Sequence, residues 1–305
     1  MNKRWVVVTA IGLVVAMGGV ALARGAANGG GALWGSRAGG LLRRGDALMK
    51  QGKLDEAVRT YRELLERYPQ ALEASGSLLG LGDIAYQQRK LVEARDTYAK
   101  MLEQFPRASV AMTAQERLGR VNIDLLFSPV VTEQDQLYEV KPGDALVKIA
   151  KQFSTTVELL KRGNRLKSDT IHPGQKLKVR AVPFHILIDK SQNTLSLISG
   201  DDVFKLYVVS TGMNNSTPVG TFTIINKLEH PVWYKAGAVV PANSPENILG
   251  TRWMGWSKEG FGIHGTQAPE AIGQQVTAGC VRMLNPDVEE LYAVVPQGAS
   301  VTVVD

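Results

Sequence analysis

The only cysteine of the chain, Cys280, and one of its four histidines, His264, are the residues whose chemistry stands out. They lie sixteen positions apart. A thiolate attacks a carbonyl carbon while an imidazole accepts the thiol proton, so this pair is suited to nucleophilic acyl transfer. A lone cysteine is more often a small buried apolar residue than a nucleophile. Composition alone therefore favours a structural cysteine.

The residues around the pair shift the balance toward catalysis. Cys280 lies in Thr277-Ala278-Gly279-Cys280-Val281-Arg282-Met283, and His264 lies in Ile263-His264-Gly265-Thr266. Glycine before the cysteine permits a tight turn and exposes a backbone N–H. Fixed N–H donors stabilise a tetrahedral oxyanion by about 3 kcal/mol each. A free thiol with a pKa of about 8.5 is only a few per cent ionised at neutral pH, so a neighbouring imidazole raises the reactive fraction.

The elements that must position this pair lie in residues 184–305. Runs of alternating apolar and polar residues predict short strands, and Ser191-Gln192-Asn193 signals a hairpin turn. A helix is expected to begin at Asn285-Pro286-Asp287, with Asn285 as its N-cap. Few helices and closely spaced strands predict a mainly-β domain of closed or sandwiched antiparallel strands.

Four ordered motifs in residues 184–305 resemble the L,D-transpeptidase catalytic domain of the YkuD type. They are Ser210-Thr211-Gly212, Thr217-Pro218-Val219-Gly220-Thr221-Phe222, Ile263-His264-Gly265-Thr266 and Thr277-x-Gly279-Cys280-Val281-Arg282-Met283. Members of that family often carry a second histidine where this chain has Ala278. Other members of the family also vary at this position, so we expect activity to be intact, and Thr277 in place of serine keeps the hydroxyl.

The resemblance implies a role for each residue of the site. Cys280 would be the nucleophile and His264 the general base and acid, with the backbone carbonyl of Gly265 orienting the imidazole. The N–H of Gly279, together with that of Cys280, would hold the oxyanion. Contacts with substrate are implied at Arg282, Thr277, Trp233, Tyr234 and Arg252. An aromatic core beneath a long loop explains residues 230–253 equally well.

The implied reaction is peptidoglycan cross-linking that needs no metal or cofactor. The thiolate would attack the third residue of a donor tetrapeptide stem, expel D-alanine and pass the acyl group to an acceptor amine, which gives a 3→3 link. Water as acceptor would make the protein an L,D-carboxypeptidase, and a lipoprotein lysine would make it a tethering enzyme. A non-catalytic wall-binding scaffold with an idle catalytic fold is the alternative of a different class.

Residues 137–180 resemble a LysM module with a βααβ order. The matching features are Lys141-Pro142-Gly143-Asp144, Asn164 and Pro173-Gly174-Gln175-x-Leu177, and we expect Asp144 and Thr155 or Thr156 to cap the two helices. The resemblance implies binding to peptidoglycan glycans. The glycan would lie between two loops, with contacts at Gly143, Asp144, Ala145, Ile171, His172 and Pro173.

Residues 41–128 repeat themselves with an offset of 37 residues, as Gly45-Asp46-Ala47 and Gly82-Asp83-Ile84 illustrate. Such self-similarity predicts stacked helical hairpins. The pattern resembles tetratricopeptide repeats, with a further helix at about 114–127 covering one side. The repeats would serve either as a docking surface for a protein partner or as a spacer.

The N-terminal residues 1–24 predict export. Lys3 and Arg4 precede an uncharged run of 19 residues, and this pattern fits both a cleaved signal peptide and a membrane anchor. Residues 25–40 are rich in glycine and alanine and predict a flexible linker. Both alternatives place the remaining chain in the bacterial cell envelope, in the periplasm or wall. The anchor alternative would also hold it in the inner membrane.

The formal net charge of +6 is concentrated in one segment. Residues 137–180 hold ten Lys or Arg and four Asp or Glu, and the difference, 10 − 4, equals the excess of the whole chain. Export argues against nucleic acid as the partner of this basic segment, and we expect none. The remaining candidate partners are an acidic wall polymer and a membrane surface. The charge is explained equally well by a solvated module that binds no anion.

Overall fold

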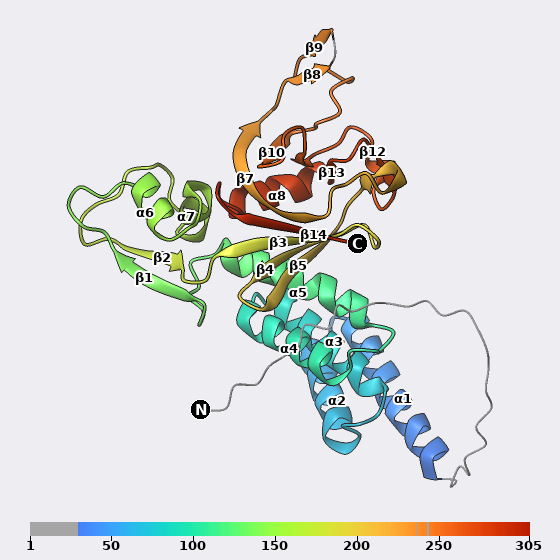
Figure 1. Ribbon diagram of the computed structural model, residues 1–305. Coiled ribbons are helices and arrows are strands. Elements are labelled where there is room, and N and C mark those ends of the chain that lie inside the picture. The colour runs from blue at the N-terminus through green and yellow to red at the C-terminus, as the bar shows by residue number, and fades with distance from the viewer. Residues whose placement is uncertain (1–29, 236, 243) are drawn as a thin grey trace, which may run out of the picture. The chain divides into compact units, whose positions relative to one another are not determined.

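The computed structural model describes residues 30–235, 237–242 and 244–305, and the chain divides into two compact units, Met1–Gly80 and Leu81–Asp305 (Figure 1). The predicted signal peptide or anchor, residues 1–24, lies outside the described residues. Within the described ranges, no helix has both the length and the apolar character needed to cross a membrane.

The first unit is helical. It contains α1 (Gly30–Lys50), α2 (Leu54–Arg67) and the start of α3 (Glu73–Gln87). The ring of Tyr61 occupies the space where Gly45 and Gly80 have no side chain, and its hydroxyl donates to Asp46 at 2.7 Å. The prediction of a flexible linker over 25–40 is wrong from Gly30 onward, because this segment is helical and Ala38 is fully buried. Packing here overrides the low helix propensity of glycine.

The same arrangement recurs 37 residues later, in the second unit. The ring of Tyr98 fills the space beside Gly82, and its hydroxyl donates to Asp83 at 2.7 Å. This unit continues with α4 (Leu91–Gln104) and α5 (Ala111–Leu126). The predicted helical repeats are confirmed, and the repeated contact explains why glycine, aspartate and tyrosine recur at fixed places.

The LysM region also has the predicted βααβ order. Its elements are β1 (Asp135–Glu139), α6 (Leu146–Gln152), α7 (Val157–Gly163) and β2 (Lys176–Arg180), with β1 and β2 antiparallel. Thr156 caps α7 by accepting from the N–H of Leu159 at 2.9 Å. Asp144, however, is not the N-cap of α6, since Ala145 holds that position. The Asp144 carboxylate instead accepts from the Lys141 N–H at 2.8 Å and the Tyr138 hydroxyl at 2.7 Å.

The C-terminal domain is built on one eight-stranded sheet in the order β13-β11-β10-β7-β14-β3-β4-β5. The strands are β3 (Phe184–Asp189), β4 (Thr194–Ser199), β5 (Asp202–Val208), β7 (Gly220–Glu229), β10 (Arg252–Trp256), β11 (Gly262–His264), β13 (Val281–Arg282) and β14 (Ser300–Val304). The mainly-β prediction is confirmed. The sheet is mixed rather than antiparallel, because β14 pairs with β3 and β11 with β13 in parallel.

Shorter elements complete the domain. They are β6 (Thr211–Gly212), η1 (Met213–Asn215), β8 (Trp233–Lys235), β9 (Ala238–Val240), η2 (Pro269–Ala271), β12 (Gln275–Thr277) and α8 (Asn285–Val294). Helix α8 lies against the part of the sheet that contains β10 and β11 (Figure 1). The β8–β9 hairpin projects from the end of β7.

Candidate active site

Cys280 lies in the short loop between β12 and β13, directly after a glycine that the fold requires. Gly279 has φ +133°, a conformation that L side chains rarely adopt. A Cβ there would lie 2.6 Å from the ring of Phe261 and 3.3 Å from the carbonyl oxygen of Ser216. Both the backbone and the available space therefore select glycine before the cysteine.

The hydroxyl of Thr277 closes this loop. It donates to the carbonyl of Cys280 at 2.6 Å and accepts from the N–H of Gly279 at 3.1 Å. Thr277 is buried, so the structure places it inside the loop and not at a surface that substrate contacts. The N–H of Gly279, expected as an oxyanion donor, is engaged by Thr277 and would have to exchange partners to fill that role.

We expect Thr277→Val to lower kcat at least about tenfold, because valine keeps the shape but can neither donate to Cys280 nor accept from Gly279. Thr277→Ser retains the hydroxyl and is expected to stay within about twofold of the wild type. Steady-state kinetics of both variants on a soluble tetrapeptide donor provide the measurement. Equal activity of the two variants would show that the hydroxyl does not hold the loop.

His264 is the last residue of β11, and its imidazole is oriented by its own neighbour. Its Nδ1 lies 2.7 Å from the carbonyl oxygen of Gly265. Because a carbonyl only accepts, Nδ1 must carry the proton, and Nε2 is left free to act as a base. The side chain is almost completely buried, and this burial lowers the pKa of His264 to about 4 against the opposing effect of the Gly265 carbonyl. The imidazole is therefore neutral at physiological pH.

The parallel pairing of β11 and β13 brings the thiol to the strand that carries His264. Ile263 pairs with Val281 and His264 with Arg282, so Cys280 comes immediately before the paired residues. Side chains alternate along a strand, and this alternation puts Cys280 and Arg282 on the His264 side. Burial raises the pKa of the Cys280 thiol, while the backbone of Gly262 and the charge of Arg282 oppose that shift. At rest, the thiol and the imidazole are therefore both neutral.

Arg282 is fixed through its backbone by the loop that follows β5. Its N–H and carbonyl exchange hydrogen bonds of 2.9 and 2.8 Å with Ser210. Its side chain is half-buried, and its Nε has no hydrogen-bond partner among the described residues. Desolvation lowers the pKa of the guanidinium, against the carboxylate of Glu270. Arg282 therefore supplies a positive charge beside the thiol with donor capacity left for a bound anion or carbonyl.

Trp253 belongs to the site, although the sequence did not single it out as a contact. It pairs with His264 across β10 and β11, and the two rings stack with centroids 6.0 Å apart at 21°. Its Nε1 donates to Asn226 at 3.0 Å, which fixes the indole. A Cβ on Gly262 would lie 2.8 Å from that ring. Gly262, which directly precedes Ile263 and His264, was the signal in the sequence for this contact, because a residue without a side chain leaves room for a large ring on the neighbouring strand.

Asn285 is the second residue whose role the sequence analysis misjudged. Leu284 is the N-cap of α8, and the Asn285 side chain reaches the loop after His264. Its Oδ1 accepts from the N–H of Thr251 at 3.2 Å and of Thr266 at 3.0 Å, while its Nδ2 donates to the Thr266 carbonyl at 2.8 Å. Asn285 thus braces the segment whose carbonyl orients the imidazole.

Arg252, Trp233 and Tyr234, the other predicted substrate contacts, lie on β10 and β8, and not on the strand or the loop that carries His264 and Cys280. Arg252 precedes Trp253 and so points to the opposite face, where it lies over the ring of Tyr292 at 5.4 Å and pairs with Glu229 at 3.7 Å. Trp233 and Tyr234 lie on β8, and Tyr234 is 76% exposed. The hairpin is tied at its base, where Asn247 donates to the carbonyls of Pro231 and Pro241.

The two predicted glycan-binding loops of the LysM region lie at the same end of its hairpin. They extend from Glu139 and Lys176, which pair across β1 and β2. The N–H of Gly174 donates to the Val140 carbonyl at 2.8 Å, which ties the loops together. Gly143 and Asp144 belong to the first loop, with Ala145 after them, and Ile171, His172 and Pro173 belong to the second. The geometry is therefore consistent with one binding site that both loops share.

Three domain families match the chain. An L,D-transpeptidase catalytic domain matches residues 183–303, a LysM domain residues 138–180 and a tetratricopeptide repeat residues 42–109. Among the described residues, no group of three or more His, Cys, Asp or Glu is placed to hold a metal ion.

The chain is also similar to individual proteins. A Bacillus licheniformis protein that carries the name L,D-transpeptidase YkuD is 34% identical over 175 residues, which cover 55% of this chain and 98% of that protein. The Bacillus subtilis protein of the same name is 34% identical and covers 54% and 97%. The catalytic domain of an E. faecium L,D-transpeptidase, solved by NMR, is 22% identical and covers 40% of this chain and 96% of that chain, with a TM-score of 0.34.

Proposed function

The chain belongs to the L,D-transpeptidase family, and on this premise we propose that it is a cysteine transpeptidase that forms 3→3 cross-links in peptidoglycan. The observation that carries the proposal is the His264–Gly265 hydrogen bond of 2.7 Å beside the cysteine loop. It leaves one imidazole nitrogen as a base on the strand next to Cys280.

In the acylation step, the Cys280 sulfur attacks the carbonyl of the third residue in a donor tetrapeptide stem. Because both groups are neutral at rest, the thiol proton passes to His264 Nε2 as the carbon–sulfur bond forms. The imidazolium then gives this proton to the departing amine of D-alanine. The Gly265 carbonyl keeps Nδ1 protonated and the ring in place throughout.

The negative charge that develops on the carbonyl oxygen needs donors on the cysteine loop. We assign this role to the backbone N–H groups of Cys280 and Gly279, the latter after it leaves the Thr277 hydroxyl. Arg282 lies on the same side of the sheet and favours an anionic intermediate and the carboxylates of a stem peptide. In the second step an acceptor amine attacks the thioester, and His264 takes its proton.

The LysM region supports peptidoglycan as the substrate. A 43-residue segment is 56% identical to part of the probable peptidoglycan endopeptidase LytE of Bacillus subtilis, covering 14% of this chain and 13% of that protein. An L,D-transpeptidase domain and a LysM module in one chain support a site of action in the cell wall. Export through residues 1–24 and a protein partner at the helical repeats are further parts of the proposal.

The proposal is tested by incubating the purified protein with disaccharide-tetrapeptide and identifying products by mass spectrometry. A cross-linked dimer that contains a tripeptide donor and free D-alanine are the expected products. Tripeptide without dimer would instead identify an L,D-carboxypeptidase. A lipoprotein lysine must be offered separately as an acceptor. If the wild type and Cys280→Ala both leave the tetrapeptide unchanged, the chain is not an enzyme for this donor and the scaffold alternative stands.

A further inference from the structure

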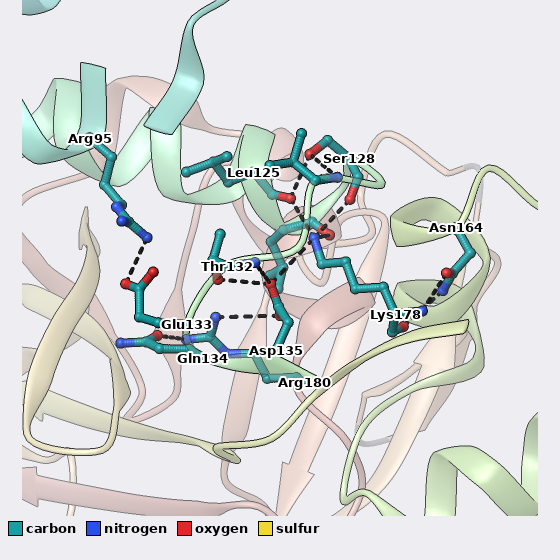
Figure 2. Close-up of polar contacts among 12 residues, drawn as sticks. Arg95, Leu125, Ser128, Thr132, Glu133, Gln134, Asp135, Asn164, Lys178 and Arg180 are labelled. Atoms are coloured by element: carbon teal, nitrogen blue, oxygen red, sulfur yellow. Dashed lines mark hydrogen bonds and ion pairs between the residues drawn. The ribbon is translucent and has the colours of Figure 1, made fainter. Parts of the chain in front are cut away.

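The strand that closes the LysM region carries two buried cations. The side chains of Lys178 and Arg180 on β2 are 5% and 6% exposed. Burial of a charge costs several kcal/mol unless other groups compensate it. The groups that compensate these two charges belong to different parts of the second unit, as Figure 2 shows.

Lys178 is bound to the end of a repeat helix. Its Nζ donates to the carbonyls of Leu125 at 2.8 Å and Ser128 at 2.7 Å, at the C-terminal end of α5 (Figure 2). These carbonyls lack partners within a helix and carry partial negative charge, so they suit an ammonium group. Asn164, at the end of α7, holds the backbone of Lys178 with hydrogen bonds of 2.7 and 2.9 Å. The lysine therefore joins the LysM region to α5.

Arg180 joins the same strand to the catalytic sheet. Its Nη2 donates to the hydroxyl of Ser199 on β4 at 2.8 Å. Its guanidinium lies 5.0 Å from the ring centroids of Phe184 and Phe204. The two rings form an edge-on pair with centroids 5.0 Å apart, and their contact with the guanidinium orients it as well as stabilising its charge.

Asp135 of β1 completes what we call the junction, defined as Asp135, Lys178 and Arg180. Its carboxylate lies 3.8 Å from Lys178 Nζ and 3.9 Å from Arg180 Nη1. Within the described part of the chain, Asp135 Oδ1 and Arg180 Nε are buried without a hydrogen-bond partner. Apolar residues of similar volume often stabilise an interface as well as a buried ion pair does, so these charges are weak evidence for stability, and we take them as evidence for a fixed orientation.

A second contact fixes the LysM region to the helix that braces the catalytic loop. The hydroxyl of Thr156, which caps α7, donates to the carbonyl of Ala293 on α8. Helix α8 begins with Asn285, whose side chain holds the loop after His264. The LysM region is thus attached to the second unit through both β2 and α7, and not through a single tether.

We propose that the junction holds the LysM module in one orientation relative to Cys280, so that the protein prefers stems carried on a glycan strand over free stems. This inference rests on the proposed transpeptidase function. Asp135, Lys178 and Arg180 are positioning residues, since they act through the placement of the module. A glycan bound by a fixed module presents its stems at a constrained distance, whereas a loosely tethered module would only raise their local concentration.

The activity test compares Lys178→Met with Lys176→Met, an exposed lysine on the same strand. Methionine keeps most of the apolar length and removes the charge. Lys178→Met is expected to bind purified sacculi normally and to retain activity on soluble disaccharide-tetrapeptide within about twofold, but to cross-link sacculi about tenfold more slowly. Equal cross-linking of sacculi by both variants, or an equal loss on both donors, would overturn the proposal.

A distance measurement tests the junction without any activity. Spin labels are placed at Lys167→Cys in the LysM region and Glu259→Cys in the catalytic domain, in a Cys280→Ser background. Double electron–electron resonance is expected to give one narrow distance distribution, which Lys178→Met broadens and Lys176→Met does not. A broad distribution with the junction intact would refute a fixed module. A narrow distribution in a protein that is inactive on both donors would refute the proposed function and leave the junction standing.

Discussion

Replacing Cys280 with alanine is expected to lower the rate of D-alanine release from a tetrapeptide donor by at least about 10⁴-fold. Without the sulfur no acyl-enzyme forms, and a direct attack by the acceptor amine would have to cross the whole barrier in one step. The change removes one half-buried atom, so the fold should be preserved.

Serine at position 280 is expected to restore little of this activity. His264 has a pKa of about 4 and is a weak base, which suits a thiol better than the much less acidic hydroxyl of serine. Release of D-alanine by mass spectrometry gives the rates, and near-ultraviolet circular dichroism confirms the fold. An alanine variant within tenfold of the wild type would show that the reaction does not pass through Cys280.

Replacing His264 with glutamine is expected to have the second largest effect, a loss of about 10²- to 10⁴-fold in kcat/KM. Glutamine can still donate to the Gly265 carbonyl but cannot accept the thiol proton. In the wild type, His264 is protonated only below a pKa of about 4, so kcat/KM should hold from neutral pH down to about pH 5 and then fall. A loss of wild-type activity centred near pH 6.5 would contradict a buried neutral imidazole.

The low pKa of His264 also makes the stability of the fold depend on pH. Burial holds the pKa of His264 at about 4, whereas an unfolded histidine has its ordinary value near 6.5. Between these values the unfolded chain binds a proton that the folded chain does not, so stability falls as the pH drops from 6.5 to 4. His264 alone should therefore lower the free energy of unfolding by about 3 kcal/mol over this interval.

His264→Gln lacks this titration, and the difference between its curve and that of the wild type should show the change. Urea unfolding at several pH values, followed by far-ultraviolet circular dichroism, measures both proteins under identical conditions. Parallel pH dependences would mean that His264 is not the buried group responsible. Thr277→Val serves as a comparison, since it disturbs the neighbouring loop but leaves the imidazole in place.

Much of the architecture was predictable because it follows local periodicity. The recurrence of Tyr61 as Tyr98 marked the helical repeats, and the Thr156 cap and the turn at Gly174 marked the LysM order. Strand positions in the catalytic domain followed the alternation of apolar residues. Parallel pairing of β3 with β14 was not predictable, because it joins residues more than a hundred positions apart.

The reactive residues of the candidate site were predictable from the sequence, but the residues that hold them in position were not. Cys280 and His264 stand out because their side chains react, whereas Asn285 resembles an ordinary helix cap in sequence. Its true partners, Thr251 and Thr266, come from other elements and are brought to it only by the fold. The orientation of Arg252 was also not predictable, because only the strand pairing shows that its neighbour Trp253 lies on the face beside the imidazole.

At the glycine-rich start of the described chain, the sequence predicted less structure than the protein has. Composition over 25–40 predicts a flexible linker, but α1 begins at Gly30. Ala38 is fully buried in this helix, so packing can hold a glycine-rich segment in a helix. Composition alone therefore did not reveal α1.

The mass of the intact protein during turnover tests the central claim most directly. After brief mixing with disaccharide-tetrapeptide in the absence of an acceptor, the wild type should gain the mass of the donor less D-alanine, on a peptide that contains Cys280. Cys280→Ala should gain nothing. An adduct on any other residue, or turnover of the donor with no adduct and no dependence on Cys280, would contradict a cysteine transpeptidase.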